Sequence, residues 1–260
     1  MATAMTGLDV GGPGPGAASL VRLWPLARGR GAPGRIRELL VALHGVAVRD
    51  DPLGVHHQRT LALHRAVVGR PIDAVVGCGC GTDNEFTVPV AQICALPAPP
   101  PDAAVRLAVA GGGPEGVARF RLPTVADLDA VAGSSADEGM RDLATRACLD
   151  TSPPHLTDAD LASLTRAWEA LDPAASVQVD LVCAGCGTEV AADVAVAEFV
   201  ADDLDRTVEG LLRDVDVIAR AYGWSEDAIL ALPTKRRRRY VELAGRSAAP
   251  RSRHLTAVAP

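Results

Sequence analysis

Apolar residues recur at helical spacing along most of this 260-residue chain, and shorter runs of alternating apolar and polar residues interrupt them. Residues three or four apart share one face of an α-helix, whereas alternate residues share one face of a strand. Helical stripes begin at Leu20, Ile36, Leu61, Leu161 and Leu204. The pattern therefore predicts a mostly α-helical α+β fold, with two related helix-plus-β-ribbon units that carry cysteine turns and a C-terminal helical segment.

Two helix starts are marked by a threonine with an aspartate three residues later. Thr124 precedes Asp127, and Thr157 precedes Asp160. This spacing is typical of a capping box, in which each side chain bonds the backbone of the other residue, here with Asp in place of the usual Glu. We expect a helix to begin after each threonine.

The C-terminal part holds the strongest amphipathic stripe, from Leu204 to Tyr222. Gly223 is expected to end this helix, and Ser225 to start a short one before a final basic helix over residues 234–243. Acidic side chains favour the positive N-terminal end of a helix. We therefore expect three aspartates near the start of the long helix: Asp202, Asp203 and Asp205.

Composition and turn signals divide the chain into five parts. Glycine and proline enrich the N-terminus, and both ends lack apolar periodicity, so we expect them to be disordered. A glycine run at 111–113 lies between two short apolar runs, which predicts a β-hairpin rather than a dinucleotide-binding loop, because a strand and not a helix follows it. The expected parts are a disordered start (1–17), two helical cysteine-ribbon units (18–115 and 116–200), C-terminal helices (201–245) and a disordered tail (246–260).

Two cysteine turns share the triplet Cys-Gly-Thr. Residues 78–82 read CGCGT, and residues 183–188 read CAGCGT. Aligning the triplets also aligns an apolar alternation that we interpret as a β-ribbon after each turn. The aligned positions are Val88, Val90 and Ala91 in the first copy and Val194, Val196 and Ala197 in the second.

The second turn has the spacing of a zinc ligand pair, because two residues between Cys183 and Cys186 let both sulfurs face one ion. The first turn has one residue between Cys78 and Cys80, and Gly77 stands where the repeat places the earlier cysteine. If the turns meet, the four cysteines form one structural zinc site. If they do not meet, the second turn is a lone pair with too few ligands.

The remaining candidate chemistry points away from catalysis. The cysteine pair does not open a helix within a βαβ unit, which disfavours a redox enzyme. Cys94 and Cys148 lie in apolar contexts and are expected in the core, and His56 and His57 are expected on the surface. No serine, histidine and aspartate arrangement matches a nucleophile motif. We therefore expect a protein that is not an enzyme.

Charge and hydropathy restrict the partners and the location. The formal net charge of −6 and the 3% aromatic content disfavour nucleic acid as the main partner. No apolar run approaches the about 18 residues of a membrane span, and the first residues do not resemble a secretory signal. These features predict a cytoplasmic protein with no membrane partner. The basic run at 235–239 keeps nucleic acid open as an alternative.

Several phrases together resemble one family. Residues 51–54 (DPLG), residues 120–124 (FRLPT) with Asp127 and Leu128, and residues 214–230 (DVDVIARAYGWSEDAIL) with the basic sequel to Tyr240 are similar to T4-like baseplate hub assembly proteins of contractile phage tails and related injection systems. The resemblance spans about residues 19–243. The chain departs from it at the first cysteine turn, where Cys-Pro-x-Cys-Gly is usual, and at residues 55–57 (VHH), where an arginine-rich segment is usual.

The resemblance implies a non-enzymatic assembly factor, either a chaperone or a minor component, that binds baseplate or hub proteins. An apolar surface flanked by arginines is the predicted contact, although a core role for its tryptophan is the competing interpretation. Its residues are Trp224, Ile229, Leu230, Arg237, Arg238 and Tyr240. Two other functions stay open: a zinc-ribbon adaptor that contacts nucleic acid through the arginine run, and a thiol-redox protein.

Overall fold

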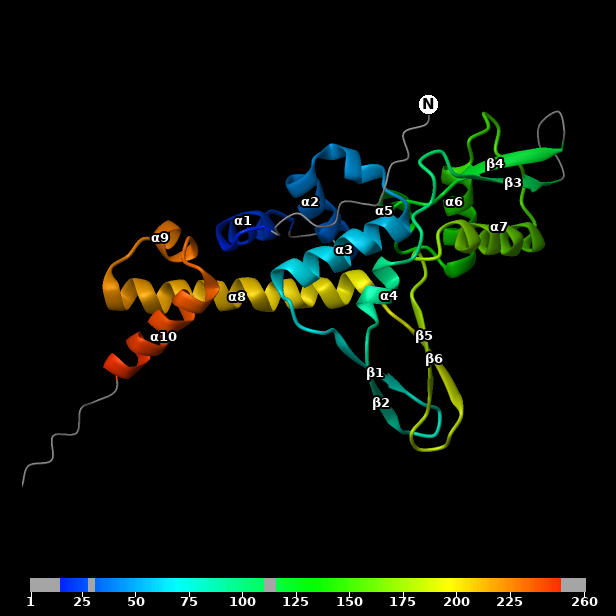
Figure 1. The fold of residues 1–260 in the computed structure, drawn as a ribbon. Helices are drawn as coiled ribbons and strands as arrows, with labels where there is room; N and C mark the ends of the chain where they lie inside the picture. The colour runs from blue at the N-terminus through cyan, green and yellow to red at the C-terminus, as the bar shows by residue number, and fades with distance from the viewer. Residues whose placement is uncertain (1–14, 28–30, 110–115, 249–260) are drawn as a thin grey trace, which may run out of the picture.

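The computed structural model describes residues 15–27, 31–109 and 116–248. The fold is mostly helical α+β, and its strands form three separate two-stranded antiparallel hairpins within the described residues (Figure 1). The predicted fold class is confirmed. The turn of the 105–122 hairpin, with its glycine run, lies outside the described residues, as do residues 1–14 and 249–260 of the expected disordered ends.

The elements alternate between helices and hairpins along the chain. The helices are α1 (Ala17–Leu23), α2 (Ala32–His44), α3 (Leu53–Val67), α4 (Val90–Cys94), α5 (Val125–Val131), α6 (Ala136–Ala147), α7 (Asp158–Leu171), α8 (Val196–Tyr222), α9 (Glu226–Leu230) and α10 (Thr234–Ala248), with short 3-10 turns η1 (Trp24–Ala27) and η2 (Val46–Asp50). The hairpins pair β1 (Asp73–Gly77) with β2 (Asp83–Thr87), β3 (Ala104–Ala108) with β4 (Val117–Arg121), and β5 (Gln178–Val182) with β6 (Glu189–Asp193).

The first hydrophobic core combines the two ends of the described chain. Its residues come from positions 20–93 and 174–230, and α8 is its long axis, against which α1, α2, α3 and α10 pack (Figure 1). Val200 and Leu204 on α8 are fully buried, as are Ile36 of α2 and Leu61 of α3. The apolar face predicted for this helix is therefore buried in the first core.

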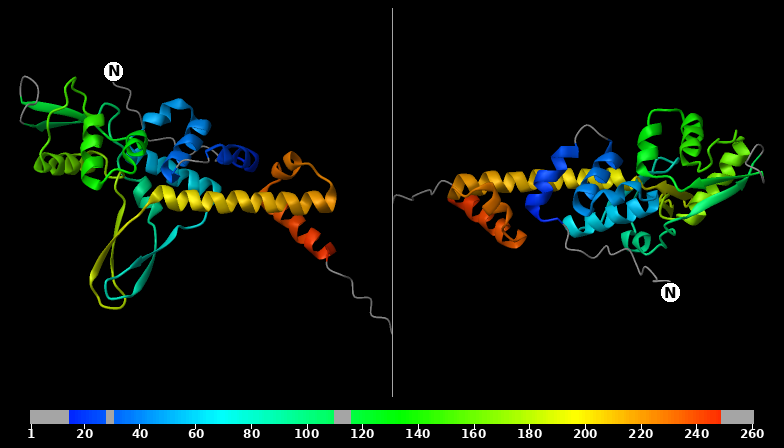
Figure 2. Two further views of the ribbon diagram at one scale, coloured as in Figure 1. Left: turned by 180° about the vertical axis from the view of Figure 1, so that it is seen from behind. Right: turned by 90° about the horizontal axis from the view of Figure 1, so that it is seen from above.

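The second core is built from one continuous segment. Its buried residues run from Val105 to Trp168 and belong to the β3–β4 hairpin, α6 and α7, which lie together beyond the end of α8 in Figure 2. Phe120 and Leu164 are at its centre. Packing therefore does not follow the expected boundaries at 115 and 200, because the first core collects residues on both sides of the second.

Backbone and carboxylate contacts join the two cores. The N–H of Leu53 donates to the carbonyl of Pro123 at 3.1 Å, and the N–H of Gly54 donates to Asp172 at 2.8 Å. This carboxylate satisfies a free N–H in the first turn of α3, whose N-cap is a proline and has no capping side chain. Asp172, the residue directly after α7, thereby performs the capping role that the residue before α3 cannot.

The helix signals in the sequence are largely confirmed. Thr124 with Asp127 and Thr157 with Asp160 form complete capping boxes at α5 and α7. Gly223 ends α8 with a φ of 68°, a left-handed conformation that favours glycine. A third capping box, made by Ser135 with Glu138, starts α6, a helix that the sequence analysis missed.

Two expectations at the C-terminal helices were wrong. Helix α8 begins at Val196, so the three aspartates are not at its N-terminal end. Instead Asp205 accepts hydrogen bonds from Arg35 at 2.7 Å and 3.0 Å and from the indole N–H of Trp24 at 2.7 Å. Helix α10 also extends to Ala248, so residues 246–248 are helical rather than part of a disordered tail. Among the described residues, no helix is long and apolar enough to cross a membrane.

Candidate metal centre

The β1–β2 and β5–β6 hairpins project side by side from the helical body, and we call this pair of hairpins the prong (Figures 1 and 2). Alternate residues of each strand are shielded, including Ala74, Asn84 and Ala192, while the residues between them are exposed. Each hairpin ends in one of the cysteine turns, so the prong carries both turns at the same end.

The two hairpins have the same backbone design, which supports the predicted repeat. The N–H of the first cysteine in each turn donates to the carbonyl of the closing threonine at 2.9 Å: Cys78 to Thr82, and Cys183 to Thr188. At the base of the hairpins the N–H of Val88 donates to Ile72 and that of Val194 to Val177, both at 2.8 Å.

The matching hydrogen bonds show where the first turn differs from the second. The turn from Cys78 to Thr82 is one residue shorter than the turn from Cys183 to Thr188. Cys78 is therefore the structural counterpart of Cys183, and the missing residue lies between Cys78 and Cys80. The expectation that Gly77 occupies the position of the earlier cysteine was wrong.

The apolar alternation after the turns does not continue as a ribbon. At Pro89 and Ala195 the chain makes a three-residue turn, closed by 2.8 Å bonds from Val90 to Val88 and from Val196 to Val194. The central dihedral angles (φ −79° and ψ 62°; φ −72° and ψ 75°) are those of an inverse γ-turn. Helices α4 and α8 begin directly after these turns. The aligned valines and alanines thus mark the start of a helix in both copies.

The four turn cysteines come together, as one of the two interpretations of the sequence required. Their sulfur atoms all lie within 4.8 Å of one another. Cys78 lies 3.7 Å from Cys186, and Cys80 lies 3.6 Å from Cys183, so each pair joins the first cysteine of one turn to the second cysteine of the other. A tetrahedral zinc ion with Zn–S bonds of about 2.3 Å separates its sulfurs by about 3.8 Å. The cluster therefore fits a metal ion such as zinc.

Hydrogen bonds to the sulfur atoms of the second turn favour the thiolate form of its two cysteines. The backbone N–H groups of Cys186 and Gly185 lower the pKa of Cys183 to about 6. The hydroxyl and then the N–H of Thr188 lower the pKa of Cys186. Donors near sulfur stabilise the charged form, which is the form that binds metal.

In the first turn, the pKa of Cys78 is shifted in the opposite direction. The N–H of Cys80 lowers the pKa of Cys78, but bonds with the thiols of Cys183, Cys80 and Cys186 outweigh it and raise the pKa of Cys78 to about 12. A thiol that shares its proton with neighbouring sulfurs is harder to ionise than an isolated one. Binding of a cation would replace these sulfur–sulfur bonds and release the shared proton.

One asparagine, which the sequence analysis missed, holds the two turns against each other. The side chain of Asn84 accepts a hydrogen bond from the N–H of Ala184 at 2.9 Å and donates to the carbonyl of Thr82 at 3.2 Å. Its amide nitrogen also lies 3.7 Å from the sulfur of Cys183. The signal in the sequence is a polar residue at an inward position of a strand, where an apolar side chain is usual.

The turns also approach so closely that one position excludes a side chain. A Cβ atom on Gly185 would lie 2.2 Å from the hydroxyl oxygen of Thr82. Cys183 is buried, while Cys80 and Cys186 are exposed. The other cysteines lie elsewhere, as expected: Cys94 packs against the first core and Cys148 against the second.

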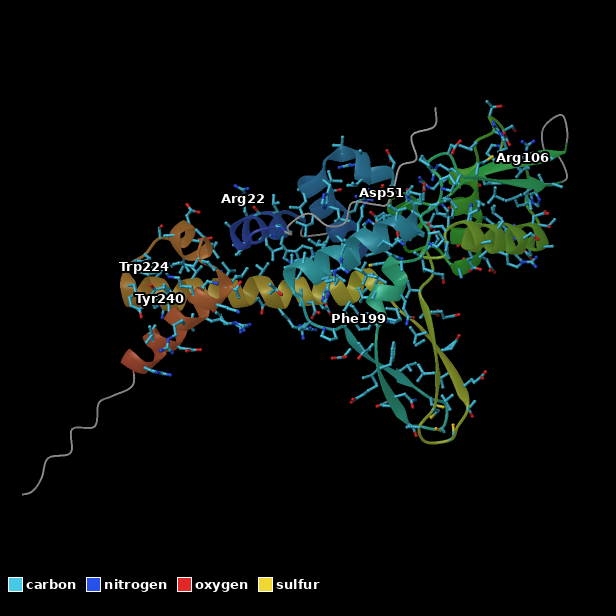
Figure 3. The ribbon with its side chains drawn as sticks, viewed as in Figure 1. Arg22, Asp51, Arg106, Phe199, Trp224 and Tyr240 are labelled. Atoms are coloured by element: carbon cyan, nitrogen blue, oxygen red, sulfur yellow. The ribbon has the colours of Figure 1, made fainter. Side chains whose placement is uncertain are left out.

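The predicted partner residues divide into two sets. Trp224 and Tyr240 lie at the junction of α8, α9 and α10 (Figure 3), with ring centroids 4.8 Å apart, and Tyr222 lies 5.4 Å and 5.6 Å from them. We call these three residues the aromatic cluster, and all are at least partly exposed. Arg238 is also exposed.

The remaining three predicted partner residues are buried. Ile229 and Leu230 pack inside the helical junction. Arg237 is buried as well, where it donates to Asp214 at 3.0 Å and to the carbonyl of Leu232 at 3.2 Å. These side chains therefore support the surface from beneath and do not form part of it.

The histidine pair is not on the surface, which corrects another expectation. His56 is 2% exposed, and its Nε2 has no hydrogen-bond partner among the described residues. Burial, then the charges of His57, Arg37 and Arg59, lower its pKa to about 3. His57 is also shielded, with Nδ1 3.0 Å from the carbonyl of Ala174.

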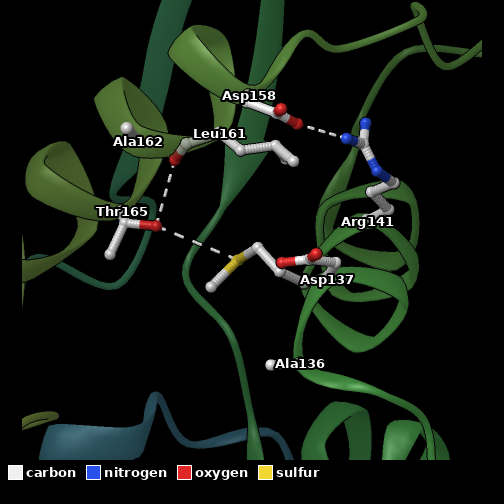
Figure 4. Close-up of a pocket in the computed structure, with 8 residues that line it drawn as sticks. Ala136, Asp137, Arg141, Asp158, Leu161, Ala162 and Thr165 are labelled. Carbon is white, nitrogen blue, oxygen red and sulfur yellow. Dashed lines mark hydrogen bonds and ion pairs between the residues drawn. The ribbon is translucent and has the colours of Figure 1, made fainter.

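A second concave feature is a cavity of about 320 Å³ between α6 and α7 (Figure 4). Arg141 forms an ion pair with Asp158 across it, and the hydroxyl of Thr165 donates to the carbonyl of Leu161 at 3.0 Å. The residues that line it include no histidine or cysteine.

No protein-family model matches the chain, and neither a curated protein nor a solved structure is significantly similar to it.

Proposed function

We propose that the protein is a non-enzymatic assembly factor, a chaperone or minor component, that binds baseplate or hub proteins of a contractile phage tail-like particle. The observation that carries this proposal is the phrase at 214–230 with its sequel to Tyr240, which resembles the ending of the baseplate hub assembly family. In this protein the phrase forms the end of α8, all of α9 and the start of α10.

The aromatic cluster is a suitable contact for such a partner. It contains both tyrosines of the chain and one of its three tryptophans, in a protein with only 3% aromatic residues. Protein interfaces are enriched in tyrosine, tryptophan and arginine, and a few such residues usually carry most of the binding energy. Arg236 lies over the ring of Tyr240, 5.8 Å from its centroid, and adds a cation at the edge of the cluster.

We also infer that the four turn cysteines hold one structural zinc ion. Four thiolates complete the tetrahedral coordination of zinc and leave no open position for a substrate or water, which is the arrangement of structural sites. The residues that would hold it are Cys78, Cys80, Cys183 and Cys186. The ion would supply cross-linking of the two hairpins, and the projecting prong would then be a rigid element of an assembly surface.

The two alternative functions predict different observations. The arginine run offers fewer free cations than its sequence indicates, because Arg237 is buried on Asp214 and Arg239 is paired with Glu242 at 2.9 Å. A nucleic-acid adaptor would still produce an electrophoretic shift with a steep dependence on salt. A thiol-redox protein would show a low-pKa, reactive Cys183 or Cys186 in alkylation kinetics.

The function is tested by deleting the gene in its native host and imaging particles by electron microscopy. Missing or deformed sheathed particles are expected, and normal particles would refute the proposal. A second test compares Trp224→Ala with Leu212→Ala, which removes an exposed apolar side chain from α8 outside the cluster. Only Trp224→Ala should reduce copurification with baseplate proteins, with little change in thermal unfolding. Loss of folding together with binding would instead assign Trp224 to the core.

A further inference from the structure

A cavity of about 540 Å³ is lined by residues from the start of α1, the end of α3, the middle of α8 and the start of α10. Its volume is within the range of sites that enclose small ligands or a few side chains. Val67 and Val68, both partly exposed, contribute an apolar part of its wall. None of the residues of the aromatic cluster lines it, so it is a separate feature of the same end of the molecule.

Four arginines give the cavity its polar wall, and we call it the arginine cavity. Arg70 and Arg206 both bind the buried carboxylate of Asp203, which also lies 2.8 Å from Nε2 of His64. Arg237 is held by Asp214 at 3.0 Å. These ion pairs fix three guanidinium groups in place.

The fourth arginine leaves an excess of positive charge. Arg238 has no carboxylate partner among the described residues, although it lines the same cavity. Asp202 is exposed and lies 4.0 Å from Arg206, so this further carboxylate pairs with Arg206 and not with Arg238. An anionic ligand would therefore find a cation that is not already neutralised.

A glycine in the middle of α8 keeps the cavity open. Gly210 lines it, within a helix of 27 residues, where glycine is less stable than alanine. Close packing does not explain this glycine, because a Cβ atom built on it would meet no described atom within 4 Å. Any larger residue would instead extend into the free space of the cavity.

We propose that the arginine cavity binds an acidic segment of a partner protein, with an apolar side chain beside its carboxylates. The carboxylates would pair with Arg238 and the fixed guanidinium groups, while the apolar side chain would contact Val67 and Val68. Inorganic phosphate or a nucleic-acid backbone would leave that apolar wall in contact with water. The inference takes one point from the proposed function, namely that the partner is a protein.

The test uses the purified full chain and a fluorescent twelve-residue peptide of Glu, Leu and Phe, with binding measured by fluorescence anisotropy. Arg238→Ala should weaken binding about threefold to tenfold. Gly210→Leu should weaken it at least as much, because leucine fills the cavity, without lowering the thermal midpoint. Two matched controls should bind as the wild type does: Arg239→Ala, whose arginine is paired with Glu242, and Gly245→Leu, at an open glycine of α10.

Peptide variants test the chemistry of the ligand. Replacing Glu by Gln, or Leu and Phe by Ser, should weaken binding in each case, and higher salt should weaken only the acidic peptides. No binding by the wild type, equal binding by all protein variants, or full competition by inorganic phosphate would each overturn the inference. Trp224→Ala should leave peptide binding unchanged. If the wild type binds the peptide but does not copurify with baseplate proteins, the proposed function alone is refuted. If the wild type copurifies with them but does not bind the peptide, the arginine cavity alone is refuted.

Discussion

The side-chain carbonyl of Asn84 accepts a 2.9 Å hydrogen bond from the backbone N–H of Ala184, which joins two turns 100 residues apart in the sequence. The position that corresponds to Asn84 in the second hairpin is Val190, since each is the second residue of its strand and faces inward. The bridge between the turns therefore comes from one hairpin only, and the repeat is not symmetric at this point.

Asn84→Val should loosen the cysteine centre while it keeps the shape of the strand. The variant copies the residue of the other hairpin and removes the bridge to Ala184 and the contact with the sulfur of Cys183. Groups that orient metal ligands typically affect metal affinity about tenfold or more. We expect faster loss of zinc to a chromogenic chelator, whereas Glu85→Ala, on the exposed side of the same strand, should match the wild type. Equal rates for both variants would exclude a role for the bridge.

Removal of one ligand should abolish stoichiometric zinc binding. The wild type, grown with zinc, is expected to hold about one ion per chain, as a site of four thiolates requires. Cys183→Ser should lose the ion and lower the thermal midpoint, because the hairpins lose their cross-link. Cys94→Ser, outside the cluster, should retain it. Metal analysis of the purified proteins decides the matter, and a wild type without zinc would contradict the assignment.

Gly54→Ala should destabilise the contact between the two cores. An added Cβ atom would lie 1.9 Å from a carboxylate oxygen of Asp172 and 2.9 Å from the backbone of Ala174. Displacing a buried carboxylate that caps α3 should cost about 2–4 kcal/mol of unfolding free energy. Gly210→Ala, at an open helical position, should instead be neutral or stabilising by up to about 1 kcal/mol. Urea denaturation of both variants measures the difference, and equal midpoints would refute the contact.

Stability should fall in mild acid because of His56. Its pKa is about 3 in the folded protein, against about 6.5 in an unfolded chain. Between these values only the unfolded chain binds the proton, so the contribution is complete above pH 6.5 and is lost as the pH falls towards 3. The loss amounts to about 2 kcal/mol at pH 5.

His56→Phe should remove this part of the pH dependence, whereas His44→Phe, at an exposed position, should not. Burial raises the pKa of Asp51 and of Asp172, and their contributions are lost as the pH rises, which is the opposite sign. The informative quantity is therefore the difference between each variant and the wild type from pH 7 to pH 4.5. A His56→Phe curve parallel to that of the wild type would show that His56 is protonated when folded.

Local signals in the sequence predicted local structure well. The capping boxes at Thr124 and Thr157 and the helix end at Gly223 depend on residues within one or two turns, and all three were confirmed. The four cysteines could also be identified as candidate metal ligands, because the spacing of the cysteines within a turn restricts the kind of site that they can form. Only the folded chain shows that the turns meet, since that contact depends on the packing of α3, which precedes the first hairpin, against α8, which follows the second.

Other features depend on which side of a helix a residue occupies. The basic run at 235–239 reads as a uniform charged surface, yet one position of the five, Arg237, turns towards Asp214 and is buried. Likewise, aligning the Cys-Gly-Thr triplets could not show where the shorter turn lacks a residue. The hydrogen bond from Cys78 to Thr82 locates that residue, and no pattern of residue types reports it.

The continuous origin of the second core has a consequence for the order in which the protein forms during synthesis. All of that core, up to Trp168, leaves the ribosome before Cys183 and Cys186 do. If it folds as it emerges, it draws residues 94 and 174 together and shortens the loop that the cysteine turns must close, which reduces the entropy lost on closure. Helix α8, which the first core requires, follows the last cysteine. Metal capture and completion of the first core are therefore the closing events of folding, and a chain released early would carry one finished core and an open pair of sulfurs.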